Sequence, residues 1–177
     1  MACFVMETPL AGEQTPQRKP WRAQALGLLG WIVTAYFAAA VGAGASVDAS
    51  TFYGQLTKPG WAPPAYLFGP VWSVLYTMMG VASWLIWKAP GRTHAALGVY
   101  LMQLAINALW SWLFFAWHLG AAAFADVALM CILIAATIGA FWRLNHFAAL
   151  LLMPYLLWVS FASALTWAVW QGNPALL

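Results

Sequence analysis

Apolar residues gather into five long runs along this chain, and short polar or basic stretches separate the runs. Each run is close to the roughly 20 apolar residues that a helix needs to cross a bilayer. The runs are too long for barrel strands, and lipid offers no partner to the backbone of irregular segments. The pattern predicts an all-α fold, an integral membrane bundle of five transmembrane helices at about residues 23–47, 65–87, 95–117, 121–142 and 147–170.

Composition points to the bilayer as the solvent. Of the 177 residues, 64% are hydrophobic and 6% are charged, whereas a soluble domain carries about 25% charged residues. The net charge of +3 is too small to indicate a nucleic-acid partner. Cys3 and Cys131 provide neither a disulfide framework nor a metal-binding spacing. We therefore expect one five-helix transmembrane domain over residues 21–177.

The basic residues predict how the chain is oriented. Residues 1–20 contain three prolines and no apolar core of the kind that a cleaved signal peptide has, so we expect a flexible cytosolic tail there. Lys58 lies alone on one side of the predicted bundle, and the other side carries Arg18, Lys19, Arg22, Lys88, Arg92 and Arg143. This bias places the N terminus in the cytoplasm. A bacterial cell membrane is the expected location, with an organelle outer membrane as the alternative.

Aromatic residues are denser than spanning alone requires. The 27 residues from Trp61 to Trp87 carry no charge and four tryptophans, although lipid anchoring needs tryptophan only at the two interfaces. Trp72 and Tyr76 lie one turn apart on the same helix face. The same spacing places two further sets on one face each of the third and fifth helices: Asn107, Trp110 and Phe114, and Trp158 with Ala162. We expect these faces to form an aromatic pocket inside the bundle.

Ordinary core packing is the competing interpretation for each of these aromatic residues. Asn107 is the more informative position, because an amide in the middle of a membrane must find partners or a ligand. A hydrogen bond between helices, worth about 0.6 kcal/mol on average, is its alternative role.

Four motifs occur in order along the chain: W-x-P-P from Trp61, V-W-x-x-L-Y from Val71, Q-L-x-x-N-x-x-W from Gln103 and P-Y-L-x-W from Pro154. Together they resemble the translocator protein / tryptophan-rich sensory protein family, also called the peripheral-type benzodiazepine receptor family. The likeness extends from about Trp31 to Asn173. It implies a five-helix bundle, usually a homodimer, with a cavity under the first loop that binds porphyrins, aromatic amides and, in some members, a sterol.

The resemblance also implies which residues bind the ligand. We add Trp61 to the residues that the resemblance implies, because we expect it to stiffen, with Pro63 and Pro64, the connection that folds over the pocket. The candidate ligand-binding residues are Tyr53, Trp61, Pro63, Trp72, Tyr76, Asn107, Trp110, Trp158 and Ala162.

The chain departs from the family pattern at two places. Thr166 stands where the family usually has asparagine, and a hydroxyl lacks the paired donor and acceptor of an amide. No lysine or arginine follows Tyr155, so the cholesterol-recognition pattern, itself weak, is incomplete.

Three functions follow from these features. The first is a membrane receptor or sensor for porphyrins and other hydrophobic ligands. The second is a light- and oxygen-dependent porphyrin-degrading enzyme, in which Trp72 and Trp158 match tryptophans implicated in some bacterial members. The third is a porphyrin or sterol transporter, although the bundle has an odd helix count, no visible repeat and no charged pathway. We rank the receptor first, because no acid–base or nucleophile–base pair lies in the predicted helices.

The three histidines, His94, His118 and His146, all fall at predicted helix ends. We therefore expect porphyrin or haem to bind as a ligand through its macrocycle, with no metal site and no required cofactor in the protein itself.

Three single residues carry further expectations. Asp126, in the fourth helix, is expected to reach the outer interface or to cap a neighbouring helix, because a carboxylate at the bilayer centre costs roughly 2.5–3.5 kcal/mol. Lys58 is expected to be a solvated loop lysine, with pairing to a porphyrin propionate as the alternative. Pro154 is expected to kink the fifth helix.

Overall fold

The computed structural model describes residues 20–177, so the tail expected over residues 1–20 lies outside the described residues apart from Pro20. Within the described part, five helical stretches are long and apolar enough to cross a membrane: Trp21–Gly44, Ala65–Trp87, His94–Ala116, Gly120–Trp142 and His146–Gly172. The prediction of an all-α bundle with five membrane spans is confirmed.

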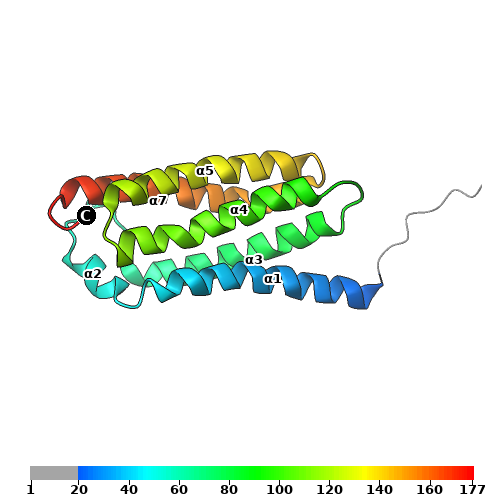
Figure 1. Ribbon diagram of the computed structural model, residues 1–177, viewed down its shortest axis with the longest axis horizontal. Helices are drawn as coiled ribbons and strands as arrows, with labels where there is room; N and C mark the ends of the chain where they lie inside the picture. Colours follow the sequence, from blue (N-terminus) through cyan, green and yellow to red (C-terminus); the bar gives the residue numbers. More distant parts are fainter. Residues whose placement is uncertain (1–19) are drawn as a thin grey trace, which may run out of the picture.

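The spans are built from α1 (Trp21–Gly44), η1 (Ala65–Leu67) with α3 (Phe68–Trp87), α4 (His94–Ser111) with η2 (Trp112–Ala116), α5 (Gly120–Trp142), and α6 (His146–Leu151) with α7 (Met153–Gly172). α1 packs on α3 and α4, α4 packs on α5, and α5 packs on α7. A short helix, α2 (Ala49–Gln55), lies at the same end of the bundle as the C terminus, and α1 begins at the other end (Figure 1). We call this end of the bundle the α2 end.

The first helix ends earlier than predicted. We expected it to continue to residue 47, but α1 ends at Gly44. The amides of Ala45 and Ser46 turn back to the carbonyls of Gly42 and Ala43, and the Ser46 hydroxyl also donates to the Gly42 oxygen at 3.0 Å. These bonds satisfy the last carbonyl groups of α1. The connection that follows contains the short helix α2.

Two other spans depart from a regular helix. The third span closes with η2, a π-helix in which the Trp117 amide donates to the Trp112 oxygen at 2.8 Å. The fifth span is divided at Leu152, between α6 and α7, and Pro154 occupies the first turn of α7. Because proline has no amide hydrogen to continue the helix ladder, a break close to Pro154 agrees with the predicted kink.

α1 lies very close to its neighbours. A Cβ atom at Gly80 of α3 would lie 2.8 Å from the Ile32 Cα of α1, and a Cβ atom at Gly42 would lie 3.1 Å from the Ser111 Oγ. Two indole nitrogens also donate to α1 backbone oxygens: Trp84 to Gln24 at 2.9 Å and Trp112 to Val41 at 3.1 Å. Small residues and indole hydrogen bonds therefore fix α1 against α3 and α4, as membrane helix packing requires.

Candidate ligand-binding cavity

A cavity of about 480 Å³ lies inside the bundle near the α2 end, and α1, α2, α3, α4, η2, α5 and α7 all contribute to its wall. Among the residues that line it there is no Asp, Glu, Lys, Arg or His. Aromatic rings, small apolar side chains and a few hydroxyl groups form the surface instead. The cavity is therefore large, uncharged and rich in aromatic surface.

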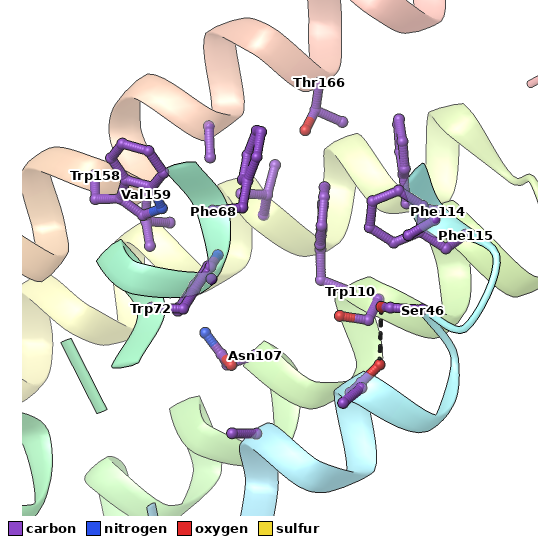
Figure 2. Close-up of a pocket in the computed structure, with 18 of the residues that line it drawn as sticks. Ser46, Phe68, Trp72, Asn107, Trp110, Phe114, Phe115, Trp158, Val159 and Thr166 are labelled. Carbon is purple, nitrogen blue, oxygen red and sulfur yellow. Dashed lines mark hydrogen bonds between the residues drawn. The ribbon is translucent and has the colours of Figure 1, made fainter. Parts of the chain in front are cut away.

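Aromatic side chains from three spans surround this space (Figure 2). Trp72 of α3 lies against Tyr76, with ring centroids 5.4 Å apart. Trp110 of α4 stacks on Phe114 at 5.1 Å and an interplanar angle of 11°. Trp158 of α7 meets the Phe68 ring edge to face at 5.9 Å. These are the offset and T-shaped arrangements that aromatic pairs prefer, so the rings support one another and still face the cavity.

A buried hydrogen-bond network lies at the side of the cavity away from α2. The Tyr76 hydroxyl donates to the Asn107 Oδ1, and the Asn107 Nδ2 donates to the Tyr155 oxygen at 2.9 Å. The Tyr155 hydroxyl donates in turn to the Gln103 Oε1 at 2.9 Å. Asn107 therefore joins α3, α4 and α7, which agrees with the interhelical role considered as its alternative. It also lines the cavity, so its ligand-binding role stays a prediction.

Most of the candidate ligand-binding residues share this cavity. Those that line it are Tyr53, Trp72, Tyr76, Asn107, Trp110, Trp158 and Ala162. Trp61 and Pro63 do not line it. Trp61 is 51% exposed and packs on Phe161 at 5.7 Å, and the Pro63 oxygen accepts a bond from the Tyr53 hydroxyl at 3.3 Å. Thr166, the position that departs from the family pattern, also lines the cavity.

Sequence reasoning missed the part of the wall that α1 contributes. Tyr36, Ala39 and Ala43 line the cavity, and so does Phe68 at the start of α3. Phe68 lies one turn before Trp72, so helical spacing was a sufficient signal for it. In α1 the signal is a set of small residues, which indicates close helix packing as readily as a cavity wall.

The connection around α2 is fixed to the end of the bundle. We call residues 45–64 the α2 segment. Asn173, just after α7, pairs with the Thr57 backbone: its Oδ1 accepts from the Thr57 amide at 2.8 Å, and its Nδ2 donates to the Thr57 oxygen at 2.9 Å. Within the segment, the Tyr53 side chain is buried, and burial raises the pKa of its phenol. The α2 segment therefore covers the cavity as an ordered structure.

Lys58 has a different environment from either expectation. Its Nζ donates to the Tyr53 oxygen at 2.6 Å and to the Leu56 oxygen at 3.2 Å, and it lies 4.7 Å from the centroid of the Tyr53 ring. It is neither a freely solvated lysine nor directed at the cavity, which it does not line. Lys58 instead stabilises the fold of the α2 segment.

We expect Asn173→Ala to loosen the α2 segment. The substitution removes both bonds to Thr57, each worth about 0.5–1.5 kcal/mol net. A loss of about 1–3 kcal/mol in local stability corresponds to roughly 5- to 160-fold faster amide exchange at Thr57. Hydrogen exchange read by mass spectrometry measures this, with Gln171→Ala, at an exposed site on the same helix end, as the control. Equal exchange in the two variants would show that Asn173 does not hold the segment.

The expectation for Asp126 is wrong. Its side chain is only 7% exposed, and its Oδ2 is buried without a hydrogen-bond partner among the described residues. It therefore neither reaches the outer interface nor caps a helix. It lies one turn before Met130, which lines the cavity, but it is not itself part of the lining.

Comparison with known proteins agrees with this architecture. The family model described as the TspO/MBR family matches residues 21–171. The human translocator protein is 40% identical over 126 residues, covering 69% of this chain and 75% of the human protein. The tryptophan-rich protein TspO of Chlorobaculum tepidum is 42% identical over 130 residues, covering 71% of this chain and 82% of that protein. The tryptophan-rich sensory protein of Cereibacter sphaeroides is 36% identical over 147 residues, covering 81% and 92% respectively. With five membrane spans and a family match over nearly all of the described residues, this chain is an integral, multi-pass membrane protein that belongs to the TspO/MBR family.

Proposed function

We propose that the protein is a membrane receptor or sensor that binds a tetrapyrrole, or another flat hydrophobic molecule, in the cavity at the α2 end. The observation that carries this proposal is the convergence of Trp72, Trp110 and Trp158, from three different spans, on one uncharged cavity. The name of the tryptophan-rich sensory protein among the relatives supports a sensory role.

Stacking is the interaction that gives such a cavity its selectivity. A volume of about 480 Å³ lies within the range of small-molecule sites, about 300–1,000 Å³. A ligand already dissolved in lipid gains little from burial alone, since lipid tails are as apolar as the cavity. Aromatic pairs add about 0.5–1.5 kcal/mol each beyond burial. Three contacts give about 1.5–4.5 kcal/mol, or roughly 12- to 2000-fold preference over bulk lipid, and a flat conjugated macrocycle gains the most.

Two indole N–H groups of residues that line the cavity are candidate hydrogen-bond donors to a ligand. The indole nitrogens of Trp110 and Trp158 are buried and have no hydrogen-bond partner within residues 20–177, whereas those of Trp84 and Trp112 donate to α1. An unpaired buried donor is costly. A ligand that brings a carbonyl or carboxyl oxygen to these groups would remove that cost.

Binding through the macrocycle rather than through iron fits the positions of the histidines. His94 and His146 begin α4 and α6, at the end of the bundle away from the cavity. His118 lies near the cavity end, but it stacks on Phe52 at 4.2 Å and does not line the cavity. We therefore expect metal-free porphyrin and haem to bind with similar affinity.

Aromatic amides and sterols are further ligand classes that an apolar cavity of this kind accommodates.

We place the protein in a bacterial cell membrane with its N terminus in the cytoplasm, which puts the α2 end on the outer side. Exposed apolar helix faces such as that of α1, with Leu26, Val33 and Phe37, are available for a homodimer.

The experiment that tests the proposal is a titration of detergent-solubilised protein with protoporphyrin in the dark, followed by porphyrin absorbance. We expect saturable binding, and we expect Trp72→Leu to weaken it by roughly 2- to 12-fold through the loss of one aromatic contact. Trp142→Leu is the matched control, because Trp142 is 48% exposed and lies at the opposite end of α5 from the cavity. Binding that is unaffected by Trp72→Leu, or equally affected by Trp142→Leu, would place the site elsewhere.

A further inference from the structure

The exposed part of the cavity wall is confined to α1, α2, η1 and α3. Every lining residue from α4, η2, α5 and α7 is buried or half-buried. The exposed lining residues are Tyr36 and Ala43 of α1, Ser50 of α2, Ala65 of η1, and Gly69 and Ser73 of α3. The cavity therefore has a mouth between α1 and α3, which are both membrane spans.

The two edges of this mouth carry small side chains. Ala43 forms the α1 edge, and Gly69 and Ser73 form the α3 edge. At its inner corner the mouth is closed by Tyr36, whose hydroxyl lies 3.0 Å from the Ser73 oxygen and 3.0 Å from the Thr77 Oγ1. Between this hydrogen-bonded bridge and the α2 segment, only small residues separate the cavity from the surrounding bilayer.

The end that faces water is closed by more and larger groups. The Asn173 pair holds Thr57, and the Tyr53 hydroxyl donates to the Pro63 oxygen at 3.3 Å. Phe52 of α2 meets the Phe114 ring at 6.3 Å. Opening this end requires breaking several hydrogen bonds and separating packed aromatic rings, whereas the side between α1 and α3 requires only the displacement of lipid.

From this contrast we infer that ligands reach the cavity sideways from the bilayer, through the mouth between α1 and α3, and not from the aqueous phase past the α2 segment. The molecules admitted are therefore those that dissolve in the leaflet next to α2. This inference concerns the route into the cavity and holds whichever apolar molecule the cavity binds.

The route can be tested with a thiol placed on the far wall. Ala162, on α7, lines the cavity and is half-buried. Ala162→Cys is introduced into a chain whose Cys3 and Cys131 are replaced by serine, and the protein is reconstituted in liposomes. Two probes are compared: uncharged N-phenylmaleimide, which partitions into lipid, and a sulfonated maleimide that stays in water. The rate of labelling is followed by mass spectrometry.

We expect the lipid-soluble maleimide to label the thiol and the sulfonated maleimide to leave it unmodified. Gly69→Trp, at a position where an added Cβ meets no atom within 4 Å, should block the mouth and slow labelling at least about tenfold, which corresponds to about 1.4 kcal/mol of added barrier. Gly139→Trp, on an exposed part of α5 with the same free space, is the matched control and should not slow it. Ala43→Trp tests the opposite edge if Gly69→Trp does not fold.

Two results would overturn the inference. In the first, the sulfonated maleimide labels the thiol at a rate similar to that of the neutral maleimide, and Asn173→Ala accelerates this labelling. That result would establish the aqueous route. The other is unchanged labelling by the neutral maleimide in folded Gly69→Trp and Ala43→Trp. Because the thiol reports access without any tetrapyrrole, neither result depends on whether the proposed receptor function is correct.

Discussion

Replacing Gly80 by alanine is expected to destabilise the bundle, although alanine is the better helix former. The new Cβ atom would lie 2.8 Å from the Ile32 Cα and 3.2 Å from the Ile32 nitrogen. These are backbone atoms of α1, which cannot move aside as a side chain does. Overpacking of this kind costs about 1–3 kcal/mol, which exceeds the gain of about 0.5–1 kcal/mol from replacing glycine in a helix.

Gly98→Ala in α4 is the control for that substitution. Gly98 is exposed, lies within a helix, and has no atom within 4 Å of an added Cβ. We expect it to be neutral or slightly stabilising, so the difference between the two variants isolates the contact between α1 and α3. Thermal unfolding in detergent, followed by circular dichroism, measures the difference. If both variants shift the midpoint equally, the close approach of α1 and α3 does not limit stability.

The sequence was sufficient to predict the five spans, because the cost of exposing polar groups to lipid makes long apolar runs easy to recognise. The details within the spans depend on where individual backbone groups find partners. Ala45 and Val47 are apolar, so hydropathy continues the first helix through them, but turn hydrogen bonds to Gly42 and Ala43 end it at Gly44. The π-helix that begins at Trp112 also depends on backbone hydrogen bonds, so hydropathy does not predict it.

The candidate site was predictable where its residues repeat at helical spacing. Trp72 with Tyr76, and Asn107 with Trp110, are one turn apart, and the structure brings both pairs to one cavity. The parts that sequence could not supply depend on which helices are neighbours. Ser46 lines the cavity only because α1 packs beside α3 and α4.

Asp126 illustrates a different limit of the sequence. Its cost in lipid favoured a position at the interface, but the structure buries it without a partner for Oδ2. The free-energy cost of burying one carboxylate decides where that side chain lies only if the packing of the helices allows more than one position. Here the packing of α5 against α4 and α7 decides the position.

The Asn107 network links the stability of the bundle to the shape of the cavity, and Asn107→Leu is expected to weaken both. The substitution takes the acceptor from the Tyr76 hydroxyl and leaves a buried donor unpaired, at a cost of about 1–3 kcal/mol. Tyr155 is less affected, because it keeps its bond to Gln103. Tyr76 also lies against Trp72, so a displaced Tyr76 ring changes the aromatic wall.

A double-mutant cycle separates this effect from a simple change in size. Tyr76→Phe removes the hydroxyl that Asn107→Leu leaves unpaired. We therefore expect the double variant to lose less stability than the two single variants lose in sum, because replacing both partners by apolar groups can be nearly neutral. Unfolding in mixed micelles measures each corner of the cycle. Ser160→Ala is the control, because that exposed hydroxyl donates to the Leu156 oxygen of its own helix. Strict additivity would mean that the bond between Tyr76 and Asn107 contributes nothing to the fold. A coupling of about 1 kcal/mol or more would show that the polar network, and not only the aromatic rings around it, maintains the geometry of the cavity.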